Sequence, residues 1–78
     1  MFTNQSVAIE VNNVVREVCR QLDESVARVD AQAPEEVRKY RIAVAKVFDL
    51  ISTEIFEPLY KDHPEIAPAI WHELNPPS

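Results

Sequence analysis

The side chains with the most versatile chemistry in this sequence are two histidines, His63 and His72, and one cysteine. A histidine beside a carboxylate can bind a metal ion or move protons, and here His63 follows Asp62 while His72 precedes Glu73. A metal centre needs three or four ligands that converge in space, and the spacing of these histidines matches no metal-binding motif. We therefore expect His63 in a turn, His72 on the surface of the C-terminal segment, and no bound metal.

The single cysteine, Cys19, does not have the setting of a reactive thiol. A nucleophilic cysteine needs a pKa lowered by a nearby cation or by a helix N-terminus. Helical spacing places Cys19 in mid-helix with Arg16 and Arg20 on the other side, which predicts a buried or half-buried packing residue. Both histidines lie in the C-terminal segment, and no turn typical of a nucleophile is present. The absence of glycine excludes glycine-rich phosphate-binding loops. We expect no enzymatic activity and no cofactor.

The charge pattern argues against nucleic acid and membrane as partners. Thirteen acidic residues outnumber eight basic ones, for a net charge of -5 over 78 residues. The basic residues Arg38, Lys39, Arg41 and Lys46 scatter around a helix among acidic neighbours, whereas nucleic-acid binding needs an organised basic face. No apolar stretch is long enough to span a membrane, and residues 1–5 lack the basic start of a secretory signal. Together with an unpaired cysteine, these features favour a cytoplasmic location.

The elements that must position these side chains are two amphipathic helices. Apolar residues between Ser6 and Asp30 recur at steps of three and four, which predicts a helix over about 6–30. Its apolar stripe, about 140° wide, comprises Val7, Val11, Val14, Val15, Val18, Leu22, Val26 and Val29. Valine loses side-chain freedom in a helix, so packing against another element must hold this helix together.

A second helix is predicted over about 34–57. Pro34 suits the first turn of a helix, and its stripe, about 120° wide, comprises Val37, Tyr40, Val44, Val47, Phe48, Ile51 and Ile55. Pro58 removes a backbone hydrogen bond, so we expect the helix to end or kink there. Further prolines divide residues 58–78 into an irregular or short-helical tail. The short connection between the helices predicts an antiparallel hairpin, and the chain is expected to form one all-α domain over 1–78.

One hairpin buries only one stripe of each helix, which is a small core for a chain of this length. No disulfide can compensate, so we expect two hairpins to pair into a four-helix bundle as a homodimer; a different protein is the alternative partner. Apolar residues outside the main stripes and in the tail are candidate interface residues: Ile42, Leu50, Phe56, Ile70 and Trp71. Coverage of some of these residues by the chain's own tail is the other interpretation.

These expectations describe a non-enzymatic protein that acts through protein–protein contacts. The favoured function is a homodimeric structural or adaptor module. The alternative is a regulatory module that holds a small apolar ligand between the helices and the tail. In that case, the pocket is expected to be lined by Phe48, Ile55, Leu59 and Trp71.

Overall fold

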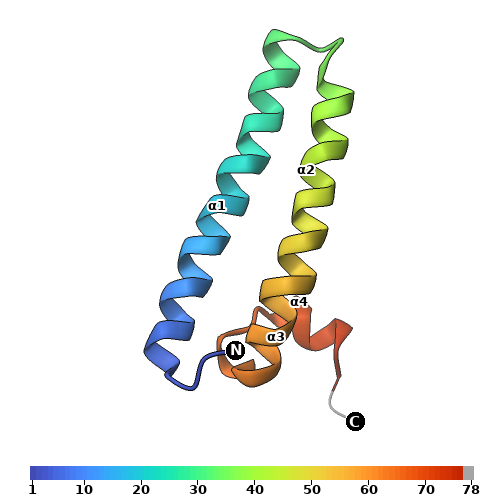
Figure 1. The fold of residues 1–78 in the computed structure, drawn as a ribbon. Helices are drawn as coiled ribbons and strands as arrows, with labels where there is room; N and C mark the ends of the chain where they lie inside the picture. The colour runs from blue at the N-terminus through green and yellow to red at the C-terminus, as the bar shows by residue number, and fades with distance from the viewer. Residues whose placement is uncertain (77–78) are drawn as a thin grey trace.

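The computed structural model describes residues 1–76, and every regular element within them is helical (Figure 1). Helix α1 spans Gln5–Gln32 and helix α2 spans Val37–Ile51 in the opposite direction. A π-helical segment at Ser52–Phe56 leads into α3, which spans Glu57–Asp62. A 3-10 turn at Pro64–Ile66 and the short helix α4, Ala69–Leu74, follow. The predicted all-α class and the antiparallel hairpin are therefore confirmed.

Helix α1 begins one residue earlier and ends two residues later than predicted, and its start is capped by Asn4. The side-chain oxygen of Asn4 accepts hydrogen bonds from the backbone N–H groups of Ser6 and Val7, at 2.8 and 3.3 Å. These bonds satisfy donors that the start of a helix leaves free. At the other end, Pro34 belongs to the turn between the helices, and α2 begins at Val37 instead of residue 34.

The second helix passes through Pro58, so the predicted end near Glu57 is wrong. Together, α2, the π-helical segment and α3 form one continuous rod from Val37 to Asp62. In an α-helix, the ring of Pro58 would strike the carbonyl group four residues earlier. Here the turn before it is wider, since the backbone N–H of Glu57 bonds to the carbonyl of Ser52, five residues back. The wide turn accommodates the proline, and the tail starts at His63. Residues 77 and 78 of the predicted tail lie outside the described residues.

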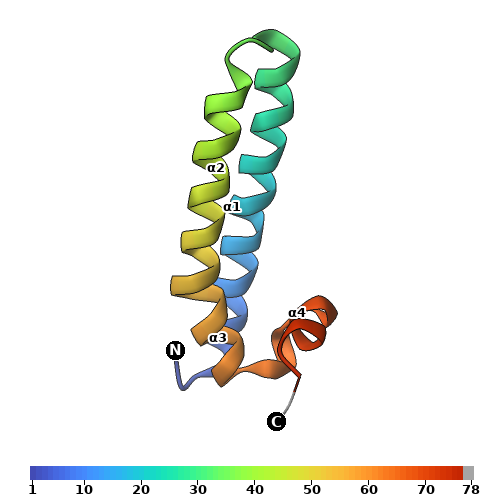
Figure 2. The same cartoon turned by 90° about the vertical axis from the view of Figure 1, so that its right-hand side faces the viewer.

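The main core lies at the base of the hairpin, where the tail folds back. Ala8, Leu59 and Tyr60 are buried there, and a ring of half-buried side chains packs around them: Phe56, Ile66, Ala67 and Trp71. The ring of Tyr60 stacks on Phe56, with centroids 5.3 Å apart, and Trp71 meets it edge-on at 5.9 Å. The tail places α4 on one side of the hairpin only (Figure 2).

Above this base, the molecule is a single layer of two helices. A hydrogen bond of 2.6 Å joins the hydroxyls of Ser25 and Tyr40, and Val37 and Val44 are buried nearby. The molecule measures 44 × 26 × 18 Å and has a radius of gyration of 14.9 Å. A compact domain of this length has a radius of gyration of about 11.5 Å. The chain is thus elongated, and much of the hairpin has only one neighbouring helix.

Candidate functional site

Large apolar side chains lie exposed along the hairpin, although the sequence places several of them in the core stripes. Within residues 1–76, the buried apolar residues are Ala8, Val37, Val44, Leu59 and Tyr60. The exposed large apolar residues on the two long helices are Val7, Ile9, Val14, Val18, Ile42, Val47 and Leu50. On the two long helices, more large apolar side chains are therefore exposed than fully buried.

On α1 the exposed valines share one edge of the apolar stripe. At about 100° per residue, Val15 and Leu22 lie near the middle of the stripe, where they are half-buried against α2. Val14 and Val18 are turned to one side and are 57% and 45% exposed. Val7 lies on the same edge, nearer the start of the helix. These valines follow a single line along the helix, on the side that α2 does not cover.

On α2 the corresponding edge carries Val47 and Leu50, which are 43% and 62% exposed, together with the exposed Ala43. In two antiparallel helices that face each other, the same rotational edge of both stripes lies on the same side of the hairpin. The two edges therefore form one surface. We call it the open face and define it by six residues: Val7, Val14, Val18, Ala43, Val47 and Leu50.

Helix α3 and the tail cover the other side of the hairpin at its base. Asn12 and Val14 lie on opposite edges of the α1 stripe. The hydroxyl of Tyr60, in α3, donates a hydrogen bond to the side chain of Asn12 on that edge. Trp71, just inside α4, packs against the same tyrosine. Figure 2 shows α4 projecting to one side of the hairpin, which leaves the open face without a covering helix.

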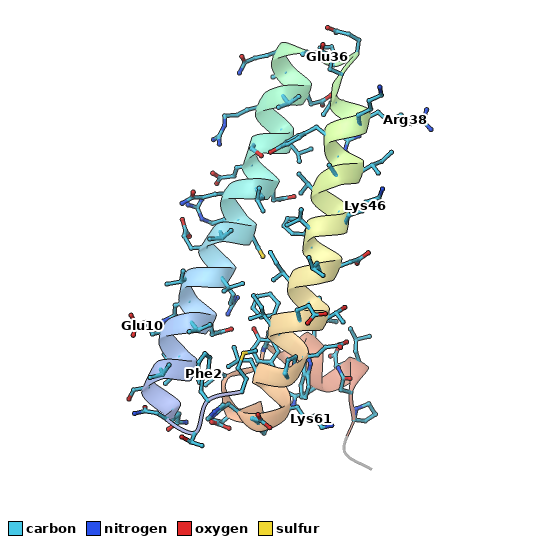
Figure 3. All side chains as sticks on the ribbon, in the orientation of Figure 1. Phe2, Glu10, Glu36, Arg38, Lys46 and Lys61 are labelled. Carbon is cyan, nitrogen blue, oxygen red and sulfur yellow. The ribbon has the colours of Figure 1, made fainter. Side chains whose placement is uncertain are left out.

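Beside Val18 and Val47, the two outer flanks of the open face carry opposite charges, although Arg28 lies further up the α1 flank and Glu54 lies on the α2 edge. Glu10 and Glu17 lie on the outer side of α1, and Lys39 and Lys46 lie on the outer side of α2. Figure 3 shows Glu10 and Lys46 pointing away from each other, on opposite flanks of the hairpin.

Within the α1 flank, Arg20 forms ion pairs with Glu17 and Glu24. Its hydrogen bonds to Glu17, supported by one from Gln21, lower the pKa of the Glu17 carboxyl from 4.5 to about 2. Glu17 therefore remains charged at any physiological pH.

The structure does not bring the five predicted interface residues together. Leu50 lies in the open face, whereas Ile42 is exposed on the outer side of α2 and Ile70 is exposed on α4. Phe56 and Trp71 are half-buried in the basal core, where both pack against Tyr60. Phe56 is thus covered within its own chain, by Tyr60 of α3, while Ile70 and Leu74 of the tail are exposed.

Sequence reasoning assigned the valines of the open face to the core. The available signal was the width of the stripes, since a seam that faces one neighbouring helix is narrower than 120–140°. The edge of each stripe that a single partner cannot reach contains Val14 and Val18 on α1 and Val47 on α2. Each stripe is wide enough for two neighbouring helices, and the hairpin supplies one.

His63, one of the side chains that could carry out chemistry, is held by structural contacts. His63 lies in the turn after α3, as expected, but it is buried: Nε2 is 2.8 Å from the carbonyl oxygen of Phe2, and Nδ1 is 3.3 Å from Glu65 Oε1. The side chain of Gln5 donates to the same carboxylate at 3.0 Å. A backbone hydrogen bond, aided by His63 and Gln5, lowers the pKa of Glu65. These contacts tie the N-terminal segment to the tail.

The other two candidates are His72 and Cys19. His72 is exposed, with Nε2 3.0 Å from the carbonyl oxygen of Pro64. Burial raises the pKa of the Cys19 thiol, which is the opposite of activation. Across residues 1–76, no three His, Cys, Asp or Glu side chains are grouped so as to hold a metal ion.

A hollow of about 400 Å³ lies between α3 and α4 and is lined by Glu57, Lys61, Trp71 and Asn75. Of the four residues expected to line a ligand pocket, only Trp71 borders this hollow. Leu59 is fully buried in the basal core. The lining is thus more polar than the predicted pocket.

No family model matches the chain, and no curated protein or solved structure is significantly similar to it. In the described part of the chain, no helix combines the length and the apolar character needed to cross a bilayer.

Proposed function

We propose that this chain is a non-enzymatic interaction module whose open face binds a second copy of the chain, so that two hairpins form a four-helix bundle. In this proposal the homodimer is the active unit, and it serves as a structural or adaptor module. The free thiol of Cys19 fits a reducing compartment, so a cytoplasmic location belongs to the same proposal.

The accessible surface area supports the proposal most directly. A compact monomer of 8.9 kDa exposes about 4,800 Å² by the usual scaling with mass. This chain exposes 5826 Å², an excess of about 1,000 Å². A standard protein–protein interface removes about 800 Å² from each partner. Pairing through one face would therefore bring each chain to the exposed area of an ordinary folded protein.

Light scattering on a size-exclusion column tests the proposal. The unmodified chain is expected to elute at about twice its 8.9 kDa mass at high micromolar concentration. Leu50→Glu places a charge in the open face and is expected to yield the monomer, because a charge cannot be buried there without a partner. Ile42→Glu is the matched control, since Ile42 is exposed on the outer side of the same helix. An unmodified chain that elutes as a monomer contradicts the proposal.

Ligand binding beside Trp71 is the second candidate. The observation that favours it is the indole Nε1 of Trp71, which is buried and finds no hydrogen-bond partner within residues 1–76. A ligand that enters between α3 and α4 would alter the surroundings of this indole. Titration with hexanol or toluene is then expected to shift the fluorescence of Trp71, the single tryptophan. An unchanged spectrum counts against this candidate.

A further inference from the structure

The hydrogen bond between Ser25 and Tyr40 fixes which parts of α1 and α2 lie at the same height. Counting eleven residues back from Ser25 along α1 leads to Val14. Counting eleven residues forward from Tyr40 along α2 leads to residue 51, next to Leu50, so Val14 and Leu50 lie at nearly the same height. By the same count Val18 lies level with Val47. The open face therefore contains an apolar band that crosses both helices at mid-height, formed by Val14, Val18, Val47 and Leu50.

Two hairpins that meet through this band by a twofold axis can do so in two ways. If the axis runs parallel to the helices, each residue has the same height along the bundle in both copies, and α1 of one copy packs on α2 of the other. If the axis runs across the helices, α1 packs on α1 and α2 packs on α2. Both arrangements surround every helix with antiparallel neighbours, so the helix dipoles do not distinguish them.

The apolar band fits the parallel axis, and it fits a crossing axis only where that axis passes through the band itself. That axis places Val14 against Leu50 of the partner subunit, at the same height, and the reverse contact follows by symmetry. With a crossing axis nearer the interhelical turn than the band, the valine-rich half of α1 would pack on the other half of the partner's α1. On the open side that half carries Gln21, Ser25 and Gln32. Apolar side chains would then face polar ones.

The charges beside the band support the same choice. Glu17, on the α1 flank, lies at the same height along the hairpin as residue 48 of α2. It is therefore close in height to Lys46, which lies on the opposite flank. A parallel axis places Glu17 beside Lys46 of the partner subunit at two symmetric positions, which is favourable. An axis across the band would pair Glu17 with Glu17 and Lys46 with Lys46.

At the upper end of the hairpin, the parallel axis brings Arg28 level with the partner's Lys39. Arg28 lies 4.0 Å from Glu24 of its own helix, which offsets this repulsion. The opposite charges beside the apolar band therefore decide the arrangement.

We propose that two copies associate about a twofold axis parallel to the helices, with α1 of each copy packed on α2 of the other. This arrangement rests on the proposed self-association. It places both interhelical turns at one end of the bundle and both basal cores, with their α4 helices, at the other.

Disulfide trapping tests the arrangement. Val14→Cys and Leu50→Cys are made separately in a Cys19→Ser background, and the two chains are mixed and oxidised. The parallel axis predicts a covalent heterodimer of the two variants, because the engineered sulfurs face each other within bonding distance. Val14→Cys alone is expected to cross-link poorly. Efficient cross-linking of Val14→Cys with itself overturns the arrangement.

Light scattering on the same samples before oxidation separates the two proposals. A non-covalent dimer that gives no Val14–Leu50 disulfide removes the parallel axis and leaves self-association standing. A monomer at every concentration removes both proposals.

Charge reversal gives an independent readout in the intact chain. Lys46→Glu is expected to raise the dimer dissociation constant roughly five- to tenfold at low salt, since two favourable pairs become repulsive. Arg38→Glu is the control, because it makes the same charge change on α2 away from the open face. The charge-swapped chain Glu17→Lys with Lys46→Glu is expected to recover the affinity. Equal effects of Lys46→Glu and Arg38→Glu would overturn the arrangement.

Discussion

At the scale of single residues, one buried hydrogen bond links the start of the chain to the end of the hairpin. The hydroxyl of Tyr60 donates to the side-chain oxygen of Asn12 at 2.5 Å, and both residues are at least 95% buried. Burial raises the pKa of the tyrosine, so the hydroxyl stays a donor. Because Phe56 and Trp71 pack on the same ring, this bond positions the whole basal core.

The variant Tyr60→Phe tests how much that hydrogen bond contributes to the free energy of unfolding. The variant keeps the ring and leaves the Asn12 amide oxygen buried without its partner, so unfolding is expected to need about 1–3 kcal/mol less free energy. Chemical denaturation followed by circular dichroism measures the loss. Tyr40→Phe is the comparison, because its hydroxyl bonds to Ser25 in a half-buried place, and we expect a smaller loss there. Equal losses for the two variants would contradict this account.

Glu17 offers a second prediction at this scale. Its folded pKa of about 2 lies below the ordinary 4.5, so its contribution to stability is complete above 4.5 and disappears as the pH falls toward 2. An NMR titration of the side-chain carboxyl is expected to show a midpoint near 2. Arg20→Gln removes the cation that lowers the pKa, and the midpoint is then expected to return toward 4.5. A midpoint that does not move would show that Arg20 is not the cause.

At the scale of elements, the π-helical segment changes which side chains face the core. A turn of this kind holds one extra residue, so everything after it is rotated by about 100° relative to a regular α-helix. In regular helical register, Phe56 falls outside the stripe of the second helix and Tyr60 points to the outside. The extra residue turns both into the basal core. Pro58 benefits as well, because the widened turn removes the clash with its ring.

This rotation also marks how far the sequence predicts the structure. The hairpin follows from periodicity and from the turn at Pro34, because both depend on local spacing. The π-helical segment depends on the tertiary gain from burying Phe56 and Tyr60, which a regular period does not express. The open face is predicted only in part. The sequence singles out Leu50, because it lies outside the apolar stripe. Val14 and Val47 lie within the stripes and look like core residues, and their exposure follows only from the fact that a single chain supplies one neighbouring helix instead of two.

A deletion tests the role of the π-helical segment. Removal of the exposed Thr53, combined with Pro58→Ala, is expected to give a regular α-helix that still turns Leu59 and Tyr60 inward. The variant should therefore melt cooperatively, with the far-ultraviolet spectrum of the unmodified chain. Deletion of Lys46 is the control. Lys46 lies in the regular part of α2, where no wide turn holds an extra residue, so its deletion rotates every later residue away from α1. If both deletions unfold the chain, the segment does more than hold one extra residue.

At the scale of the whole molecule, the single layer above the basal core is the least protected part. Val14, Val18, Val47 and Leu50 are all at least 43% exposed in the isolated chain, and a second hairpin would bury them. The basal core is complete without a partner, since the tail covers it. We therefore expect the base to stay folded in a dissociated chain while the upper hairpin loses stability.

The thermal stability of the chain is then expected to depend on its concentration. An association that binds only the folded form shifts the equilibrium away from the unfolded chain, and the shift grows as the concentration rises. A hundredfold increase in concentration is expected to raise the melting temperature by several degrees in calorimetry or circular dichroism. Leu50→Glu is expected to remove this dependence and Ile42→Glu to keep it, because only the first position lies on the open face. A melting temperature of the unmodified chain that is independent of concentration would mean that the apolar band stays exposed to water.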